Sequence, residues 1–265
     1  MKVIILGYSG FLGSHLLKHN FFANVEKILP SRKNTLLKEG NDLFIPFEEA
    51  FSSIKNLKPE LIINLIGVLR EKYKGEYRKA HIETVKGIIE AAKTYENAKI
   101  IHISAIGTSE ECKSEYFHTK LQAEKMLLSS GLEVIIIRPG IVFGEGQKLF
   151  EDLKKISILT PFIICPSSKV AICDINKFVD SIVEASSKQV KRGIYEIYTE
   201  VISFKNFFKK SLNFIGIKRI VIPVPKIFIL PVALLGEITN MSPINLEQYR
   251  MLKCPAIPSG KFPVL

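Results

Sequence analysis

Residues 1–17 read MKVIILGYSGFLGSHLL, and the order of residue types in this stretch decides the fold. Val3 to Leu6 is a continuous apolar run, which is typical of a strand buried on both faces of a parallel sheet. Three glycines follow at once, and the leucines beyond them fall at helical spacing. The stretch therefore predicts a strand, a glycine-rich turn and a helix.

Each of the three glycines has its own steric role in such a unit. Gly7 permits the sharp turn, Gly10 lets the backbone approach a pyrophosphate, and Gly13 lets the helix pack closely on the strand. The phosphates would then bind to free N–H groups at the positive end of the helix. Glycine turns also join ordinary strands and helices, but the position between a buried strand and a helix favours nucleotide binding.

The composition is that of a folded protein. The chain has 265 residues, of which 47% are hydrophobic, enough to form a full core in one large domain or a main domain with a small appendage. The net charge of +11 comes from scattered Lys and Arg residues that are not interleaved with aromatic residues. No nucleic-acid partner is therefore expected, and the basic surface favours some attraction for anionic ligands or lipids.

The four cysteines show no pattern typical of a redox motif or a metal site. Cys112, Cys165, Cys173 and Cys254 form no C-x-x-C pair and have no companion histidines at metal-ligand spacing. We therefore expect free thiols in a reducing compartment and no metal site. The first apolar run is too short for a signal peptide, so a cytoplasmic location is expected.

Apolar runs alternate with helical patterns along the first part of the chain. This alternation predicts an α/β fold, a Rossmann-type doubly wound parallel sheet. After the first strand, the predicted strands are 28–29, 61–66, 100–103 and 134–137, and the predicted helices are 14–22, 47–54, 77–94 and 117–129.

The alternation fades from about residue 145, where prolines become frequent. We expect a dinucleotide-binding core at residues 1–145. Residues 146–265 are expected to complete the sheet and to form a small irregular substrate cap over its carboxyl edge, where ligands bind in such folds.

Residues 220–235 form an almost wholly apolar stretch. It is short for a bilayer span and is broken by prolines, so no transmembrane segment is expected. A core or cap helix is the simpler interpretation. A membrane-surface or oligomer contact, helped by Lys218 and Arg219, is the alternative, which leaves peripheral membrane contact and a monomer or homodimer open.

Tyr116 and Lys120, in EYFHTKLQAEK, form the second group with possible chemistry. One helical turn places both side chains on one face, where the ammonium can lower the pKa of the phenol. Such a phenol can exchange a proton with a carbinol while a hydride moves to or from a nicotinamide. A Tyr and a Lys four residues apart are common, but their position after the strand at 100–103 favours a catalytic site.

The end of the second strand, in ILPSRKN, bears on the choice of cofactor. Folds that select NAD place a carboxylate there for the ribose 2′-hydroxyl, whereas this chain has Ser31, Arg32 and Lys33 with no acid nearby. A guanidinium can bind a 2′-phosphate through paired hydrogen bonds. NADP(H) is therefore the preferred cofactor and NAD(H) remains possible; the alternative is that Arg32 and Lys33 form a solvated loop.

Five motifs resemble the extended short-chain dehydrogenase/reductase family, in its epimerase-like and atypical branches. They are GYSGFLG at 7–13, INLIG at 63–67, HIS at 102–104, YFHTK at 116–120 and RPGIVFG at 138–144. Their order and spacing agree over residues 1–145, and a weaker likeness continues through KVAICDINKFVDSI and GIYEIYTEVISF. The closest likeness is to atypical members that include the NADPH-binding accessory subunit of respiratory complex I.

The resemblance implies a role for each matching position. Tyr116 would transfer the proton, and Lys120 would bind the ribose hydroxyls. Ser104 would be the remaining catalytic residue, although Ala105 follows it where the family usually has a second Ser or Thr, and His81 stands in place of the usual Asn. The implied cofactor-binding residues are Gly7, Tyr8, Ser9, Gly10, Phe11, Leu12 and Gly13 at the pyrophosphate, Asn64, Leu65, Ile66, Gly67 and Val68 at the nicotinamide-side ribose, and Pro139 and Gly140 beside the nicotinamide.

The leading interpretation is an NADP(H)-binding oxidoreductase-type protein that acts by hydride transfer with Tyr/Lys proton transfer. Its small-molecule substrate would be an unknown carbonyl, alcohol or sugar nucleotide. One alternative is a non-catalytic dinucleotide-binding redox sensor, or an accessory subunit of a membrane-associated assembly. Another alternative is a sugar-nucleotide epimerase or dehydratase.

Overall fold

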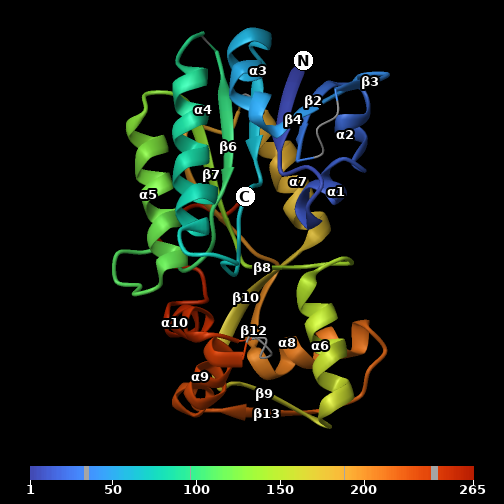
Figure 1. The fold of residues 1–265 in the computed structure, drawn as a ribbon, viewed down its shortest axis with the longest axis vertical. Helices are drawn as coiled ribbons and strands as arrows, with labels where there is room; N and C mark the ends of the chain where they lie inside the picture. The colour runs from blue at the N-terminus through green and yellow to red at the C-terminus, as the bar shows by residue number, and fades with distance from the viewer. Residues whose placement is uncertain (33–35, 96, 188, 240–243) are drawn as a thin grey trace.

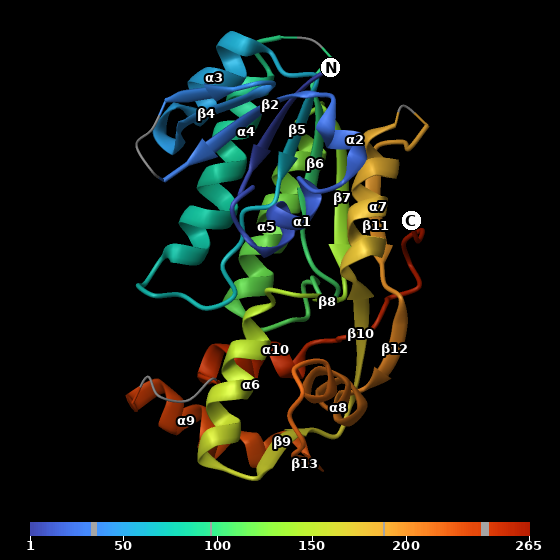
Figure 2. The same cartoon turned by 90° about the vertical axis from the view of Figure 1, so that its right-hand side faces the viewer.

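The computed structural model describes residues 1–32, 36–95, 97–187, 189–239 and 244–265. The described chain forms two lobes, one above the other in Figure 1. The upper lobe contains the N-terminal strand and the large sheet. The lower lobe contains short strands and the helices α6, α8, α9 and α10 (Figures 1 and 2).

Within these residues, the upper lobe is built on an eight-stranded sheet in the order β11-β7-β6-β5-β1-β2-β4-β3. Its neighbouring strands are parallel, except that β3 runs antiparallel to β4 at one edge. The chain winds first to one side of β1 and then, from β5, to the other. The strands are β1 Lys2–Leu6, β2 Glu26–Ser31, β3 Leu37–Glu39, β4 Asp42–Pro46, β5 Leu61–Asn64, β6 Lys99–Ile103, β7 Glu133–Pro139 and β11 Gly193–Ile197.

Alternate side chains of each strand enter two cores, one on each face of the sheet. Val3 and Ile5 pack in the core beneath α1 and α7, whereas Ile4 and Leu6 pack in the core beneath α3, α4 and α5. The predicted doubly wound parallel sheet is therefore confirmed. The helices are α1 Phe11–Leu16, α2 Asn20–Ala23, α3 Ala50–Leu57, α4 Thr84–Ala92, α5 Glu115–Ser129 and α7 Ile175–Ser186, with a 3₁₀ turn η1 at Phe47–Glu49 before α3.

The single helix predicted at 14–22 is wrong. α1 begins directly after Gly10, its N-cap, and ends at Leu16. A second short helix, α2, follows because His19 has an extended backbone and its Nδ1 accepts the N–H of Phe21 at 3.2 Å. A side chain that caps a new helix start competes locally with continuation of the old one.

The helix predicted at 77–94 is interrupted near its start. Residues Arg78–Glu83 form a π-helical turn, η2, and the regular helix α4 begins only at Thr84. Turns of this kind are rare and are found often at functional sites. Here the turn carries His81, whose side chain is fully buried.

The strand predicted at 28–29 is longer in the structure. β2 begins at Glu26 because the buried Lys27 amine is satisfied by Asp42 at 2.7 Å and by the carbonyl of Phe22 at 2.8 Å. A lysine breaks an apolar run in the sequence, but its paired ammonium is tolerated inside the sheet. β3 and β4 were not predicted.

The lower lobe contains two small sheets around a core of its own. One sheet has the order β12-β10-β8 and the other pairs β13 with β9 in parallel. Two elements of the second half return to the upper lobe, namely α7 under the large sheet and β11 at its edge. The lobe's elements are β8 Ile141–Phe143, α6 Lys148–Leu159, β9 Phe162–Pro166, β10 Lys169–Asp174, β12 Glu200–Ser203, α8 Phe204–Phe214, β13 Ile220–Val224, η3 Lys226–Ile229, α9 Leu230–Thr239 and α10 Leu246–Lys253.

The apolar stretch 220–235 is not one helix. It forms the strand β13, the 3₁₀ turn η3 and the first part of α9. Pro225 is the N-cap of η3 and Pro231 lies in the first turn of α9, where a missing N–H costs no helical hydrogen bond. Among the described residues, none of the helices combines the length and apolar character that crossing a bilayer needs.

Candidate functional site

The glycine turn lies at the carboxyl end of β1, against the end of β5. Gly7 has a φ of +85°, and a Cβ on it would lie 3.2 Å from the backbone N of Ile66. A Cβ on Gly13 would lie 2.4 Å from the Cα of Tyr8, so only glycine fits there. A Cβ on Gly10 would meet only the carbonyl oxygen of Gly7, at 3.3 Å. Gly13 is thus required for packing, whereas the outer side of Gly10 is open.

The loop after β5 runs beside this turn, as the reversal of strand order at β1 requires. The N–H of Leu65 donates to the carbonyl of Leu6 at 2.9 Å. The predicted pyrophosphate residues 7–13 and ribose residues 64–68 are therefore brought together. Ser31 ends the neighbouring strand β2, and the exposed Arg32 follows it; Lys33 lies outside the described residues.

Asn64 and His102 form a buried pair on the face of the sheet that α4 and α5 cover. The amide Nδ2 of Asn64 donates to Nδ1 of His102 at 3.0 Å, while its Oδ1 accepts the N–H of Ile66 at 3.1 Å. The proton of this imidazole therefore resides on Nε2, a buried atom that has no hydrogen-bond partner among the described residues. Burial, followed by the charge of Lys120, holds the pKa of His102 well below its usual range.

His81 links α5 to the loop after β5. The hydroxyl of Thr119 donates to backbone carbonyls of its own helix, so Nδ1 of His81 donates to that hydroxyl at 2.8 Å. Nε2 is then free to accept the N–H of Val68 at 3.4 Å. Burial, the charge of Lys120 and the neighbouring His102 lower the pKa of His81 to about 2, so the ring is neutral. The sequence identified His81 only as a departure from the family pattern, not as this bridge.

Lys120 is buried beside the loop that follows β5. Its Nζ donates to the carbonyl of Ile103 at 2.7 Å, and a Cβ on Gly67 would lie 3.4 Å from Nζ. Burial lowers the pKa of Lys120 to about 8, against the opposing charge of Glu124. The structure therefore places Lys120 close to Gly67, and both residues were expected at the ribose.

Tyr116 lies one turn before Lys120, in a cluster of rings. Its ring centroid is 5.9 Å from that of Tyr77, 5.5 Å from that of His81 and 5.0 Å from that of Phe117. The expectation that Lys120 lowers the pKa of the phenol is wrong for this structure, because burial raises the pKa of Tyr116 to about 12. Removal of the phenol from water disfavours the charged phenolate, and the pKa of Tyr116 rises as a result.

Ser104 is the first residue after β6, and its hydroxyl contacts another hydroxyl. It bonds to Thr108 Oγ1 at 3.3 Å, and Thr108 in turn donates to the carbonyl of Ala105 at 2.9 Å. Pro139 holds the same loop, because its carbonyl accepts the N–H of Ile106 at 3.0 Å. Gly140 is closely packed, since a Cβ on it would lie 2.5 Å from the carbonyl oxygen of Ala171.

A buried ion pair fixes α5 on the sheet. Arg138 of β7 donates to both carboxylate oxygens of Glu124, at 2.8 and 2.5 Å, and both side chains are almost fully buried. A paired fork of this kind sets the rotation of a helix on a sheet. The site helix α5 is thus held from below by Arg138.

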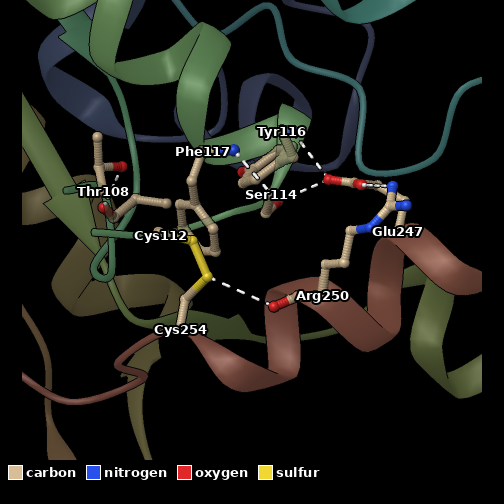
Figure 3. Close-up of a disulfide and its surroundings, with 9 residues drawn as sticks. Thr108, Cys112, Ser114, Tyr116, Phe117, Glu247, Arg250 and Cys254 are labelled. Atoms are coloured by element: carbon tan, nitrogen blue, oxygen red, sulfur yellow. Dashed lines mark hydrogen bonds and ion pairs between the residues drawn. A yellow bond between two sulfur atoms is a disulfide. The ribbon is translucent and has the colours of Figure 1, made fainter. Parts of the chain in front are cut away.

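The C-terminal segment holds α5 from the other end, as Figure 3 shows. Glu247 of α10 accepts the hydroxyl of Ser114, the N-cap of α5, at 2.6 Å, and the N–H of Tyr116 at 3.0 Å. Nearby, a disulfide joins Cys112 to Cys254. α10 and the loop before α5 are therefore linked both covalently and through a carboxylate.

The prediction of four free thiols is thus wrong for two of them. Cys112 and Cys254 are 142 positions apart in sequence, and packing of α10 beside α5 brings their Cα atoms within 5.3 Å. Such a pairing cannot be inferred from cysteine spacing. Cys165 and Cys173 are free and buried.

Comparison with known families agrees with this geometry. The sequence matches the NAD dependent epimerase/dehydratase family over residues 3–161, and the chain belongs to that family. The match includes the glycine turn, the loop after β5, and Tyr116 with Lys120. The predicted family is thereby confirmed.

Curated proteins are similar to part of this chain, as two examples show. The mitochondrial 40 kDa subunit of NADH-ubiquinone oxidoreductase from Neurospora crassa is 30% identical over 102 residues, which cover 38% of this chain and 27% of that protein. An uncharacterized UDP-glucose epimerase of Bacillus subtilis is 25% identical over 190 residues, which cover 67% of this chain and 52% of that protein. The matched regions thus span about half or less of these relatives.

Solved structures share the fold at low sequence identity. A nucleoside-diphosphate-sugar epimerase from Staphylococcus aureus has a TM-score of 0.74 at 14% identity, covering 95% of this chain and 88% of that one. A dTDP-4-dehydrorhamnose reductase from Bacillus anthracis, solved with NADP, has a TM-score of 0.67 at 16% identity, with 84% of each chain covered. A Bordetella bronchiseptica enzyme solved with NAD⁺ has a TM-score of 0.70 at 15% identity, covering 84% of this chain and 85% of that one. The Rossmann-like fold of such epimerase structures is therefore shared by this chain.

Proposed function

We propose that this chain binds NADP(H) across the carboxyl ends of β1 and β5 and reduces a small carbonyl substrate beside Tyr116. The observation that carries the proposal is the convergence of three predicted groups. The glycine turn and the loop after β5 lie side by side, since a Cβ on Gly7 would lie 3.2 Å from the backbone N of Ile66. The same loop lies beside Lys120, whose Nζ would be 3.4 Å from a Cβ on Gly67. One extended dinucleotide could contact all three in turn.

The residues present fit such a cofactor. The outer side of Gly10 is open where a side chain would otherwise project, and Gly67 keeps a side chain away from the amine of Lys120. Gly7, Gly10 and Gly13 would hold the pyrophosphate, and Lys120 would hold the ribose. When bound, the dinucleotide would supply the hydride.

The protein itself would supply the proton that the reduction needs. Burial raises the pKa of Tyr116 to about 12, so at neutral pH the phenol keeps its proton at Oη. A protonated phenol suits reduction, in which Oη donates its proton to the carbonyl oxygen as that oxygen gains charge. The Nζ of Lys120, when charged, would stabilise the negative charge left on the phenolate oxygen.

A second candidate function is binding without catalysis, as a redox sensor or accessory subunit. The observation that favours it is the hydroxyl of Ser104, which bonds to Thr108, while Ala105 offers no hydroxyl at the next position. Only the hydroxyl of Ser104 is left to orient a substrate carbonyl, and that hydroxyl already bonds to Thr108.

The two candidates are separated by a matched substitution. The nucleotide that copurifies with the protein would be identified by mass spectrometry, and hydride transfer would be followed with a panel of carbonyls, alcohols and sugar nucleotides. Tyr116→Phe keeps the ring and removes only Oη. An enzyme loses turnover in this variant with nearly unchanged cofactor affinity, whereas a protein that turns over none of the panel is assigned to the second function.

A further inference from the structure

The end of the lower lobe farthest from the large sheet exposes a group of large apolar side chains. We call it the apolar tip, and its members share high exposure at the end of α6, on β9, on β13 and in η3: Ile158, Leu159, Phe162, Ile220, Ile227 and Phe228. β9 and β13 lie at the same end of the molecule in both views, with the lower end of α6 beside them (Figures 1 and 2).

The apolar tip follows from strand periodicity. β9 and β13 form a two-stranded ribbon in which Phe162 is the register partner of Ile220. Their neighbours in sequence, Ile163 and Val221, enter the core of the lower lobe, so Phe162 and Ile220 face outward. A strand with one solvated face ordinarily has polar residues there, but this ribbon is apolar on both faces.

The end of α6 and the turn η3 add the most exposed members. Ile158 and Leu159, at the end of α6, are each 84% exposed, and Phe228 of η3 is 66% exposed. η3 packs against β9, so these elements adjoin one another. Soluble monomers rarely leave such a contiguous apolar surface without a partner.

The charges around the tip have mainly one sign. The segments 148–166 and 205–237, which contain the tip and its flanking helices, hold nine Lys or Arg residues and three Asp or Glu residues. Lys154, Lys155 and Lys218 are exposed. The guanidinium of Arg219 is fixed at the end of α6, because it donates to the carbonyl of Ser157 from two nitrogens.

We propose that the apolar tip docks this protein on an anionic lipid bilayer. Apolar side chains at the end of a lobe can enter the boundary between headgroups and acyl chains, while the surrounding lysines contact anionic headgroups. This charge complementarity favours a bilayer over a second copy of the chain, which would bring two basic surfaces together. The docking is peripheral and independent of the nucleotide site.

The test is sedimentation of the full chain with vesicles of phosphatidylcholine, alone or mixed with phosphatidylglycerol. The protein should bind the mixed vesicles, and added salt should weaken the binding. The double variant Leu159→Glu/Phe228→Glu should lower the partition coefficient by at least about tenfold. Leu36→Glu/Leu37→Glu, at two exposed leucines of the upper lobe, adds the same charge, is the matched control and should leave the coefficient nearly unchanged.

A charge variant tests the lipid specificity. Lys154→Glu/Lys155→Glu should lower partitioning to mixed vesicles by at least about tenfold, whereas Lys38→Glu/Lys55→Glu in the upper lobe should have a much smaller effect. Absence of vesicle binding, or equal binding by the tip variant, overturns the proposal. A second contrary outcome would come from sedimentation equilibrium. If the parent protein binds no vesicles but forms a dimer, and the tip variant is a monomer, the tip is a self-association surface.

Discussion

The carboxylate of Glu247 accepts a hydrogen bond from the backbone N–H of Tyr116 at 3.0 Å, across 131 positions of the sequence. The same Oε1 accepts the hydroxyl of Ser114 at 2.6 Å. The first N–H groups of a helix have no partners within it, and a negative charge is stabilising at that end. α10 therefore supplies a second cap, in addition to Ser114, for the helix that carries the candidate catalytic pair.

Removal of this cap should destabilise the protein. We expect Glu247→Ala to lower the free energy of unfolding by about 2 kcal/mol, because a partly buried hydroxyl and an N–H lose a charged acceptor. Urea denaturation measures the change. Arg250→Ala is the control, since it removes only an exposed 3.3 Å ion pair with Glu247 and should cost about 0.5 kcal/mol or less. Equal effects of the two variants would contradict the role of Glu247 as a cap.

The disulfide should stabilise the same junction. Cys112 and Cys254 close a loop of 142 positions, and a cross-link of that length restricts the unfolded chain. We expect Cys254→Ser to lower the free energy of unfolding by about 2–4 kcal/mol under non-reducing conditions. A phosphine reductant should lower the stability of the parent protein similarly and leave Cys112→Ser/Cys254→Ser unaffected. A parent protein insensitive to the reductant would show that the bond does not stabilise the fold.

The glycine turn gives a pair of variants with opposite outcomes. Gly13→Ala should lower the free energy of unfolding by at least about 2 kcal/mol, because its Cβ would collide with the backbone of Tyr8. Gly10→Val should cost about 1 kcal/mol or less, since Gly10 has an ordinary φ of −80° and an open outer side. Dinucleotide affinity, measured by calorimetry, should nevertheless be lost in Gly10→Val. Unchanged affinity there would remove the pyrophosphate from this turn.

Arg32 should determine the cofactor preference. It follows the last residue of β2 and is exposed, so its guanidinium is free to meet a 2′-phosphate. We expect Arg32→Ala to weaken NADPH binding by about tenfold to a hundredfold and to leave NADH binding unchanged. Arg78→Ala, at an exposed arginine of η2, is the matched control. Parent protein that binds NADH as tightly as NADPH would exclude the preference.

The sequence predicted the sheet well because buried parallel strands are nearly continuous apolar runs. The first four residues of the run at 61–66 became β5, which ends at Asn64, and the run at 100–103 became most of β6. The same signal failed at β2, where Lys27 interrupts the run and is satisfied by Asp42, a residue of another strand. Local periodicity contains no information about such a distant partner.

The candidate site likewise contains features that the sequence predicts and features that it does not. The glycine turn and the spacing of Tyr116 and Lys120 are local patterns, so both could be found in the sequence. The bridge from Thr119 through His81 to Val68 joins three separate segments, and it depends on a π turn that periodicity does not predict. The sign of the Tyr116 pKa shift was missed for a related reason, because the rings that help to bury Tyr116 and so raise its pKa come partly from other elements.

His81 should make the protein sensitive to acid. Burial lowers its pKa to about 2, whereas the unfolded chain titrates near about 6.5. Below pH 6.5 the unfolded state therefore binds a proton that the folded state does not, and stability falls as the pH falls. Each unit of pH in this window costs up to about 1.4 kcal/mol for this group.

The variant His81→Asn, which has no titrating group at this position, should lose that contribution. We expect the free energy of unfolding of the variant, relative to the parent, to improve by up to about 1.4 kcal/mol per unit between pH 6 and 4. Above about pH 8 the difference should be constant, since imidazole no longer titrates in either state. Urea denaturation at a series of pH values measures both ranges. Parallel curves for the two proteins throughout would mean that His81 titrates alike when folded and unfolded, contrary to its burial between Thr119 and Val68.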